Sequence, residues 1–230
     1  MLKDHIQRGD YTNPTAPKLV FSVIRITGVF VGVFLMVYWT DGLESLSDVW
    51  KNAPVLLFFA CLFLAVAQQL YWLWAIARER FTWFMALFPW NTGLDLLWLY
   101  FLSNALNRGV PVIIWVYLGA VLCVAGLLIE LISNLQLQFF KREPGNGGKL
   151  FTGGLFSLVI HPNYTGYLLW RTAFPMMTGY PLAAGVAFIF HLAQFYFQAH
   201  PPFIRYMHQK YGREWEIYSS NRKRIIPGLL

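Results

Sequence analysis

A His-Pro-Asn-Tyr turn at residues 161–164, directly before an apolar stretch, is the first candidate for chemistry in this chain. His161 and Asn163 flank Pro162, so the backbone is expected to turn sharply just before the apolar residues begin. A histidine can orient or polarise a substrate, and an asparagine amide can hydrogen-bond a ribose or an amide. A lone histidine is equally well a structural residue, and both interpretations of His161 stay open.

A polar loop, residues 141–160, leads into this turn. It is rich in glycine, contains a proline, and carries Lys141, Arg142 and Lys149. In a membrane protein, irregular backbone is tolerated only where protein or a water-filled cavity satisfies its N–H and C=O groups. We therefore expect the loop and the turn to form the site, with the basic side chains attracting the phosphates of a cofactor.

Three ionisable residues, Asp95, Glu130 and Arg171, interrupt apolar stretches. Such residues are costly in a membrane and favour a functional interpretation. The guanidinium of Arg171 could hold a phosphate or a carboxylate through two hydrogen bonds. The alternative is a structural ion pair with Glu130 or Asp95.

A polar stripe follows the same spacing as one face of a helix. Glu130, Asn134 and Gln138 are four residues apart and share that face. At the cytosolic end of a helix bundle, this stripe would suit a ribose, an amide or an adenine. The alternative is a helix that simply leaves the membrane.

The C-terminal tail has aromatic and apolar residues at three- and four-residue steps, typical of an amphipathic helix. These residues are Phe203, Met207, Tyr211, Trp215 and Tyr218. Gly212 is expected to interrupt the helix. It could lie at the membrane interface, or fold back over the loop as a lid with Arg205, Tyr206 and Arg222 facing a ligand.

The composition is that of an integral membrane protein. Of 230 residues, 57% are hydrophobic and 13% are charged, whereas soluble domains are about one-quarter charged. The net charge of +7 is attributed to basic membrane flanks rather than to nucleic-acid binding. Cys61 and Cys123 fall in apolar stretches, and the histidines lack metal-ligand spacing, so we expect no disulfide and no metal site.

Apolar stretches predict an all-α bundle in a single domain, residues 1–230, with about six membrane-spanning helices and a cytosolic amphipathic helix. Pro89 and Gly93 are expected to break the third span. The predicted spans are residues 19–39, 54–77, 81–103, 110–135 (continuing to 140), 164–180 and 182–198.

Loop charges predict the orientation of these spans. Basic residues gather in the N-terminal tail, the second and fourth loops and the C-terminal tail, which places both termini in the cytosol. The membrane would be the endoplasmic reticulum in a eukaryote or the inner membrane in a bacterium.

Residues from Asn134 to Trp170, together with the tail, carry a family resemblance. The matching positions are Phe140-Lys141, Pro144, Asn146, Gly148-Lys149, Gly154-Leu155-Phe156, His161-Pro162-Asn163-Tyr164, Gly166, Tyr211, Tyr218 and Ile226-Pro227. This pattern resembles the C-terminal domain of steroid 5-alpha-reductases, within the superfamily that includes isoprenylcysteine carboxyl methyltransferases. The resemblance implies that residues 134–230 hold a cofactor and that residues 1–133 form the substrate side.

The chain departs from the family pattern at three places. Tyr167 stands where the reductases usually have a glutamate that polarises the substrate carbonyl, and a phenol could donate the same hydrogen bond. Ile160 replaces the usual arginine before His-Pro. Residues 198–201 lack the glutamate pair that helps methyltransferases hold their cofactor.

The resemblance implies an NADPH-dependent reductase of a C=C bond in a steroid- or lipid-like enone. The alternatives are an S-adenosylmethionine-dependent methyltransferase acting on a lipid or prenylated substrate, and a non-catalytic membrane scaffold. The expected catalytic residues are Tyr167 and His161. The expected cofactor-binding residues are Asn134, Gln138, Lys141, Lys149, Asn163, Tyr164, Arg171, Arg205, Tyr206, Tyr218 and Arg222.

Overall fold

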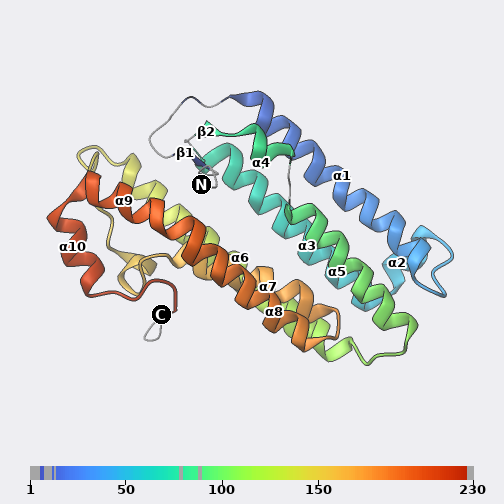
Figure 1. The fold of residues 1–230 in the computed structure, drawn as a ribbon. Coiled ribbons are helices and arrows are strands. Elements are labelled where there is room, and N and C mark those ends of the chain that lie inside the picture. The colour runs from blue at the N-terminus through green and yellow to red at the C-terminus, as the bar shows by residue number, and fades with distance from the viewer. Residues whose placement is uncertain (1–5, 8–11, 13, 78–79, 88–89, 227–230) are drawn as a thin grey trace.

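Long apolar stretches become long helices that run side by side in one bundle (Figure 1). The computed structural model describes residues 6–7, 12, 14–77, 80–87 and 90–226. Its α-helices are α1 Thr15–Trp39, α2 Leu46–Lys51, α3 Ala53–Tyr71, α4 Trp83–Leu87, α5 Trp90–Asn107, α6 Ile113–Arg142, α7 Pro162–Met177, α8 Pro181–Gln194, α9 His200–Tyr211 and α10 Arg213–Ser220. The predicted all-α polytopic membrane fold is confirmed.

The shorter elements extend or brace these helices. A π-helical turn, Trp72–Ile76, prolongs α3, and a second, Phe195–Ala199, joins α8 to α9. A 3-10 turn, Gly154–Ser157, lies in the loop before α7. The strands β1 Ile6–Gln7 and β2 Arg80–Phe81 pair antiparallel, so the N-terminal segment is held against the connection that follows α3.

Within the described residues, four helical segments are long and apolar enough to cross a membrane. They are Thr15–Trp39, Ala53–Ile76, Ile113–Arg142 and Pro181–Tyr211. The first three coincide with the predicted first, second and fourth spans. Helices α5 and α7, with 18 and 16 residues, are not among the four, so six crossings stay a prediction.

The predicted third span was wrong at its start. Residues 80–81 belong to β2, and the long helix α5 begins only at Trp90. Gly93 lies inside α5 and does not break it, because a single glycine costs a helix only about 1 kcal/mol. Pro89, the other expected breaker, lies outside the described residues.

The predicted end of the sixth span was also wrong. The helix does not stop at residue 198 but continues through a π-helical turn into α9, which ends at Tyr211. Pro201 and Pro202 lie in the first turn of α9, where their missing N–H groups and the ring clash would disrupt a regular helix. The wider π-helical turn just before them changes the hydrogen-bond pattern there, which lets the helix pass through both prolines.

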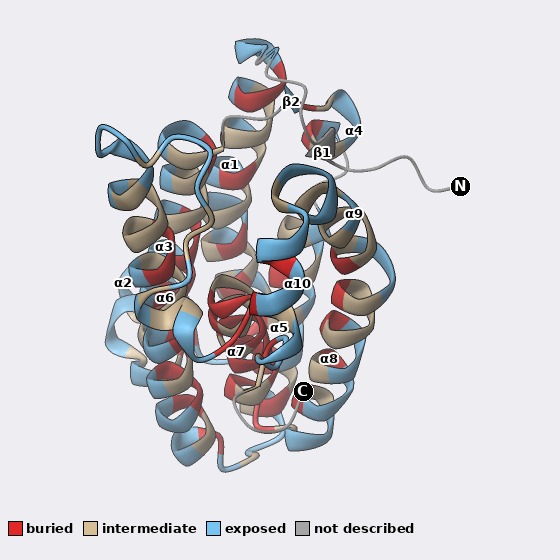
Figure 2. Ribbon diagram, turned by 90° about the vertical axis from the view of Figure 1, so that its left-hand side faces the viewer, coloured by how far each residue is buried: buried red, intermediate tan, exposed pale blue. Residues whose placement is uncertain are grey.

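Helix α7 lies at the centre of the bundle and is the most buried element (Figure 2). It packs most extensively against α6, at glycines where the two backbones nearly touch. A Cβ atom on Gly166 would lie 2.5 Å from the Gly126 carbonyl oxygen, and one on Gly126 would lie 2.6 Å from the Trp170 nitrogen. Small residues allow this close packing, which fixes α7 and hence the His-Pro-Asn-Tyr turn at its start.

The C-terminal tail folds back on the loop before α7. Gly212, with φ +49°, separates α9 from α10 as predicted. The backbone N–H groups of Ile160 and His161 then donate to the carbonyl oxygens of Lys223 and Arg224, both at 2.9 Å. Of the two interpretations of the tail, folding back over the loop is therefore the one observed, at the end of the bundle opposite α2 (Figure 1).

Candidate functional site

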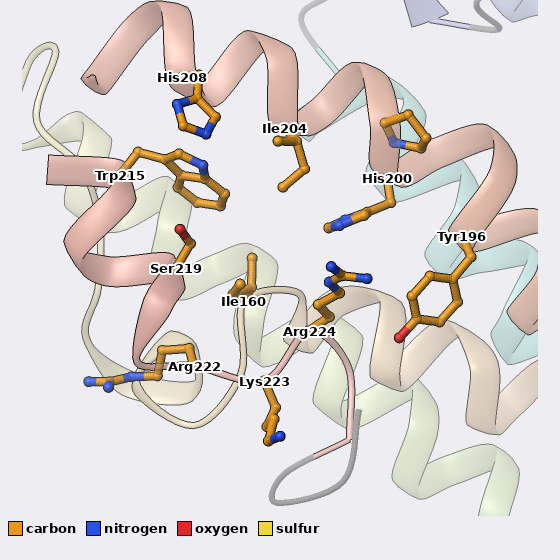
Figure 3. Close-up of a pocket in the computed structure, with 11 residues that line it drawn as sticks. Ile160, Tyr196, His200, Ile204, His208, Trp215, Ser219, Arg222, Lys223 and Arg224 are labelled. Atoms are coloured by element: carbon orange, nitrogen blue, oxygen red, sulfur yellow. The ribbon is translucent and has the colours of Figure 1, made fainter. Parts of the chain in front are cut away.

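An open pocket of about 820 Å³ lies where the tail closes over α9 and the loop (Figure 3). This volume is within the range of about 300–1,000 Å³ typical of small-molecule and cofactor sites. It is lined by Ile160, Tyr196, His200, Pro201, Ile204, His208, Trp215, Ser219, Arg222, Lys223 and Arg224. The pocket is thus built from the end of the loop before α7, the π-helical turn Phe195–Ala199, α9, α10 and the segment that follows α10.

Basic side chains dominate the charge of the pocket. Arg222, Lys223 and Arg224 line it, and no aspartate or glutamate is among the described residues that do so. The Nε of Arg222 is buried and has no hydrogen-bond partner in the described part of the chain. The guanidinium of Arg224 lies 5.6 Å from the centre of the Tyr196 ring. This donor set suits an anionic ligand that also presents a flat ring system.

A pair of buried histidines connects the pocket to the His-Pro-Asn-Tyr turn. The Nε2 of His161 lies 3.1 Å from the Nδ1 of His200. The rings of Phe203 and Phe195 pack against His161, with centroids 4.4 and 5.0 Å away, and hold it in place. The His200 ring points into the pocket (Figure 3). Because only one of the two facing nitrogens needs to carry a proton, the pair can take up or release a proton at the pocket wall.

Tyr218 contacts the pocket wall through Trp215. Its hydroxyl donates to the Phe156 carbonyl oxygen at 2.7 Å, and its ring packs against the buried Trp215 at 5.7 Å. Burial raises the pKa of Tyr218 to about 12, although the nearby Arg222 opposes this effect. The phenol therefore stays neutral and joins α10 to the loop.

The structure brings only part of the predicted site together. Arg222 lines the pocket, His161 contacts it through His200, and Tyr218 lies beneath it. Asn163 and Tyr164 are half-buried at the start of α7, and the Tyr164 ring packs 4.9 Å from that of Phe195. These five residues gather at one end of the bundle.

Other predicted residues do not line the pocket. Lys141 is exposed in the last turn of α6, because this helix continues to Arg142, beyond the predicted start of the loop. Lys149 is exposed on the loop, and Arg205 is exposed on α9. The hydroxyl of Tyr206 accepts a hydrogen bond from Lys210. Tyr167 packs against Trp170, with ring centroids 5.3 Å apart, on the bundle side of α7.

The polar stripe on α6 serves contacts between elements. Asn134 is buried, and the Gln138 amide donates to the Ala75 carbonyl oxygen at 3.1 Å. Glu130 accepts a hydrogen bond from the Trp170 indole at 2.7 Å. Arg171 pairs with Asp95 at 3.1 Å, so the ion-pair alternative is the one observed for it.

Among the pocket residues that sequence reasoning missed are three with polar, ring-bearing side chains, His200, His208 and Tyr196. His200 directly precedes two prolines, which predicted the end of a helix rather than its continuation. A histidine at such a junction was the available signal, but its partner His161 is 39 residues away in sequence.

Comparison with known proteins finds similarity to methyltransferases and to a steroid dehydrogenase. The chain is 33% identical over 129 residues to a probable O-methyltransferase, ustE, of Ustilaginoidea virens, covering 50% of this chain and 44% of that protein. It is 37% identical over 116 residues to a probable protein-S-isoprenylcysteine O-methyltransferase of Oryza sativa subsp. indica, covering 48% and 60%. It is 31% identical over 112 residues to 3-oxo-5-alpha-steroid 4-dehydrogenase 1 of Mus musculus, covering 49% and 42%.

The chain thus spans about half the length of the curated relatives it matches. No solved structure matches it. The names of these relatives are consistent with the predicted superfamily of reductases and methyltransferases. A family profile matches residues 93–220, more than half of the chain and most of the pocket, and by this match the protein belongs to the family described as protein of unknown function DUF1295.

Proposed function

We propose that the protein is an NADPH-dependent reductase of a C=C bond in a lipid-like enone, with its cofactor in the pocket beside α9. The observation that carries this proposal is the run Arg222, Lys223 and Arg224 on the pocket wall, without a carboxylate among the described lining residues. NADPH presents several phosphate oxygens, which guanidinium and ammonium groups bind well. S-adenosylmethionine carries a sulfonium cation, which the same wall would repel.

The lining residues divide into two roles under this proposal. Arg222 and Arg224 would bind phosphate, and the flat faces of Tyr196 and Trp215 would pack against the rings of the cofactor. When bound, NADPH supplies the hydride. Saturating a C=C bond also takes one proton, and the His161–His200 pair can deliver it from the pocket wall.

The substrate would reach the site from the bilayer. Tyr167 lies six residues beyond His161 on α7, about 9 Å further along the helix axis. It remains our candidate for orienting the substrate, since its phenol can donate a hydrogen bond to a carbonyl oxygen. The apolar exterior of the bundle is consistent with a hydrophobic substrate.

Methyl transfer is the second candidate, because relatives at 33 and 37% identity are named as O-methyltransferases. In that case S-adenosylmethionine would bind in the same pocket. With a hydroxyl acceptor, His200 would accept the proton released as the O–CH3 bond forms and the thioether leaves, whereas a carboxylate acceptor releases no proton. The two candidates thus share the histidine pair and differ in the charge of the cofactor.

Cofactor binding separates the two candidates. The purified protein in mild detergent should be stabilised by NADPH, by about 2.7 kcal/mol at a hundredfold excess over the dissociation constant, and not by S-adenosylmethionine. The double substitution Arg222→Gln/Arg224→Gln should abolish the NADPH effect. As a control matched in charge, Lys51→Gln/Arg108→Gln should preserve it. Lys51 is the last residue of α2, a helix at the end of the bundle opposite α10 (Figure 1), and Arg108 directly follows α5. Stabilisation by S-adenosylmethionine alone would favour the methyltransferase, and no effect of either would contradict both.

A further inference from the structure

A short segment after α10 lies between the pocket and the turn before α7. It comprises residues 223–225 and is called the strap below. The carbonyl oxygen of Lys223 accepts the Ile160 N–H at 2.9 Å, and Lys223 also lines the pocket. The carbonyl oxygen of Arg224 accepts the His161 N–H, again at 2.9 Å. The strap therefore contributes basic side chains to the pocket wall while its backbone is bonded to the turn.

Arg224 contacts the pocket and the histidine pair at the same time. Its guanidinium lies 5.6 Å from the centre of the Tyr196 ring and points toward His200 (Figure 3). Its carbonyl oxygen is bonded to His161, whose Nε2 lies 3.1 Å from the Nδ1 of His200. An anion bound by this guanidinium is thus connected to the histidine pair through both the side chain and the backbone of one residue.

Thr165, in the first turn of α7, holds the last residue of the strap. Its hydroxyl donates to the Ile225 carbonyl oxygen at 2.6 Å and lies 3.2 Å from the carbonyl oxygen of His161. A hydroxyl has one proton, so the nearer oxygen on the strap is its main acceptor. Ile225 is only 1% exposed, so water does not readily replace this donor. Thr165 itself does not line the pocket.

We propose that Thr165 is a positioning residue of the site. By holding the strap closed, its hydroxyl keeps the Arg224 guanidinium in place for the phosphate of a ligand, beside the histidine pair. This role rests on one part of the proposed function, the binding of an anion in the pocket. A ligand that binds only while the strap is closed must also make opening of the strap less frequent.

The alternative role for Thr165 is a brace that holds the tail whether or not a ligand is bound. Amide hydrogen exchange separates the two roles, because the N–H groups of Ile160 and His161 are bonded to the strap and exchange when it opens. A positioning role requires that a bound anion slows this exchange through Arg224. A brace requires no such response.

The first measurement uses the wild-type, full-length protein in mild detergent, with NADPH and inorganic pyrophosphate as separate probes. At about a hundredfold excess over its dissociation constant, each probe should slow exchange of the Ile160 and His161 amides about 100-fold. The Leu43 amide, bonded to the Thr40 carbonyl oxygen between α1 and α2, is the control. Its exchange rate should be the same with and without either probe.

Threonine variants test the hydroxyl. Thr165→Val keeps the shape of the side chain but loses the donor, so exchange of the two amides without ligand should rise about fivefold, the equivalent of one hydrogen bond. Thr165→Ser keeps the hydroxyl and should restore the wild-type rate. Thr172→Val is the matched control, because the Thr172 hydroxyl donates to the Leu168 carbonyl oxygen at 2.8 Å within α7 and does not contact the strap.

An arginine variant tests the connection to the ligand. Arg224→Gln keeps the backbone carbonyl group, so without ligand the Ile160 and His161 amides should exchange as in the wild type. The probes should no longer slow them, a loss that a simple brace does not predict. Arg205→Gln, which removes an exposed charge from α9 outside the pocket, is the control and should preserve the slowing.

The outcomes separate this inference from the proposed reductase. Slowing by NADPH supports both, and slowing by pyrophosphate alone supports the strap but contradicts the reductase. Stabilisation by NADPH without slower exchange at Ile160 and His161 would overturn the inference and leave the reductase standing. No binding of either probe would overturn both. If Thr165→Val does not fold, the wild type and Arg224→Gln still decide.

Discussion

His200 occupies the position that links the pocket to the sequence motif before α7. Its ring faces the pocket while its Nδ1 lies against the Nε2 of His161, which is itself enclosed by aromatic rings. In a contact between two imidazole nitrogens, one donates and the other accepts, so the tautomer of His200 is linked to that of His161. This geometry makes His200 the candidate for proton transfer and His161 the residue that positions it.

Replacing His200 tests that assignment. His200→Ala should lower the turnover number at least about 100-fold, the usual contribution of a general acid or base, and change NADPH affinity little. His208→Ala is the control, since His208 also lines the pocket but is exposed and lies 3.7 Å from Glu216. Steady-state kinetics with a reducible enone would measure both variants. Equal losses in the two would show that His200 only shapes the pocket.

Tyr218 gives a prediction that depends on pH. Its folded-state pKa of about 12 lies above the ordinary tyrosine value of about 10, so its contribution to stability is complete below about pH 10 and is lost as the pH rises through about 12. Tyr218→Phe should cost about 1 kcal/mol at neutral pH, because the Phe156 carbonyl oxygen loses its donor. Thermal unfolding from neutral pH to about pH 12 should show this difference shrinking with pH. A difference that stays constant would mean that the hydroxyl proton is not involved.

For individual residues, the residue types in the sequence predicted part of the site. The His-Pro-Asn-Tyr turn and the basic tail were sufficient to mark His161 and Arg222 as site residues. They were not sufficient for His200, because its role depends on a contact with a residue 39 positions away. Similarly, a charge in an apolar stretch predicts that Arg171 needs a partner, but only the fold shows that it shares Asp95 with Arg25.

Helices α6 and α7 pack closely because glycines, which have no side chain, lie where the two backbones meet. The space between Gly126 and Gly166 has no room for a methyl group on either residue. Gly166, the glycine in the His-Pro-Asn-Tyr-x-Gly motif, therefore has a packing role. Its close contact with α6 fixes the position of α7 along α6, and hence the position of His161 relative to the loop and tail.

Substituting this glycine should disturb the helix pair. Gly166→Ala should lower the free energy of unfolding by about 1–3 kcal/mol, the usual cost of overpacking. Gly185→Ala on α8 is the matched control, because a Cβ atom there would meet nothing within 4 Å, and it should leave stability the same or up to about 1 kcal/mol higher. Denaturant unfolding in detergent would compare the two. If both variants behave alike, the contact between α6 and α7 is looser than described.

The helices themselves were predictable where one physical signal dominated. Long apolar stretches predicted α1, α3 and α6 closely, because bilayer thickness demands about 20 such residues. The length of an apolar stretch failed to predict a helix correctly where a second local feature, such as proline or strand pairing, also acted. Prolines at 201 and 202 suggested that the helix ends there. Instead, the π-helical turn Phe195–Ala199 precedes them and the helix continues into α9. A short strand pair likewise takes Phe81 out of the third predicted span.

For the whole molecule, the orientation in the membrane remains a prediction from loop charges. Reporter fusions after Leu230 and in the connection between α7 and α8 should report opposite sides, with Leu230 in the cytosol. The basic residues of the pocket would then face the cytosolic supply of cofactor. Fusions that report the same side would exclude an odd number of crossings between these two points.

The continuous helical segment from Pro181 to Tyr211 is longer than the hydrocarbon layer of a membrane is thick. Its 31 residues extend about 46 Å, whereas the hydrocarbon layer is about 30 Å thick, so one end of it must project from the lipid. That projecting end carries His200, Ile204 and His208, which are walls of the pocket. A change in bilayer thickness would therefore change how far these three residues lie from the lipid surface. Under the proposed function, the turnover rate would therefore depend on the acyl-chain length of the host membrane and differ between thin and thick bilayers.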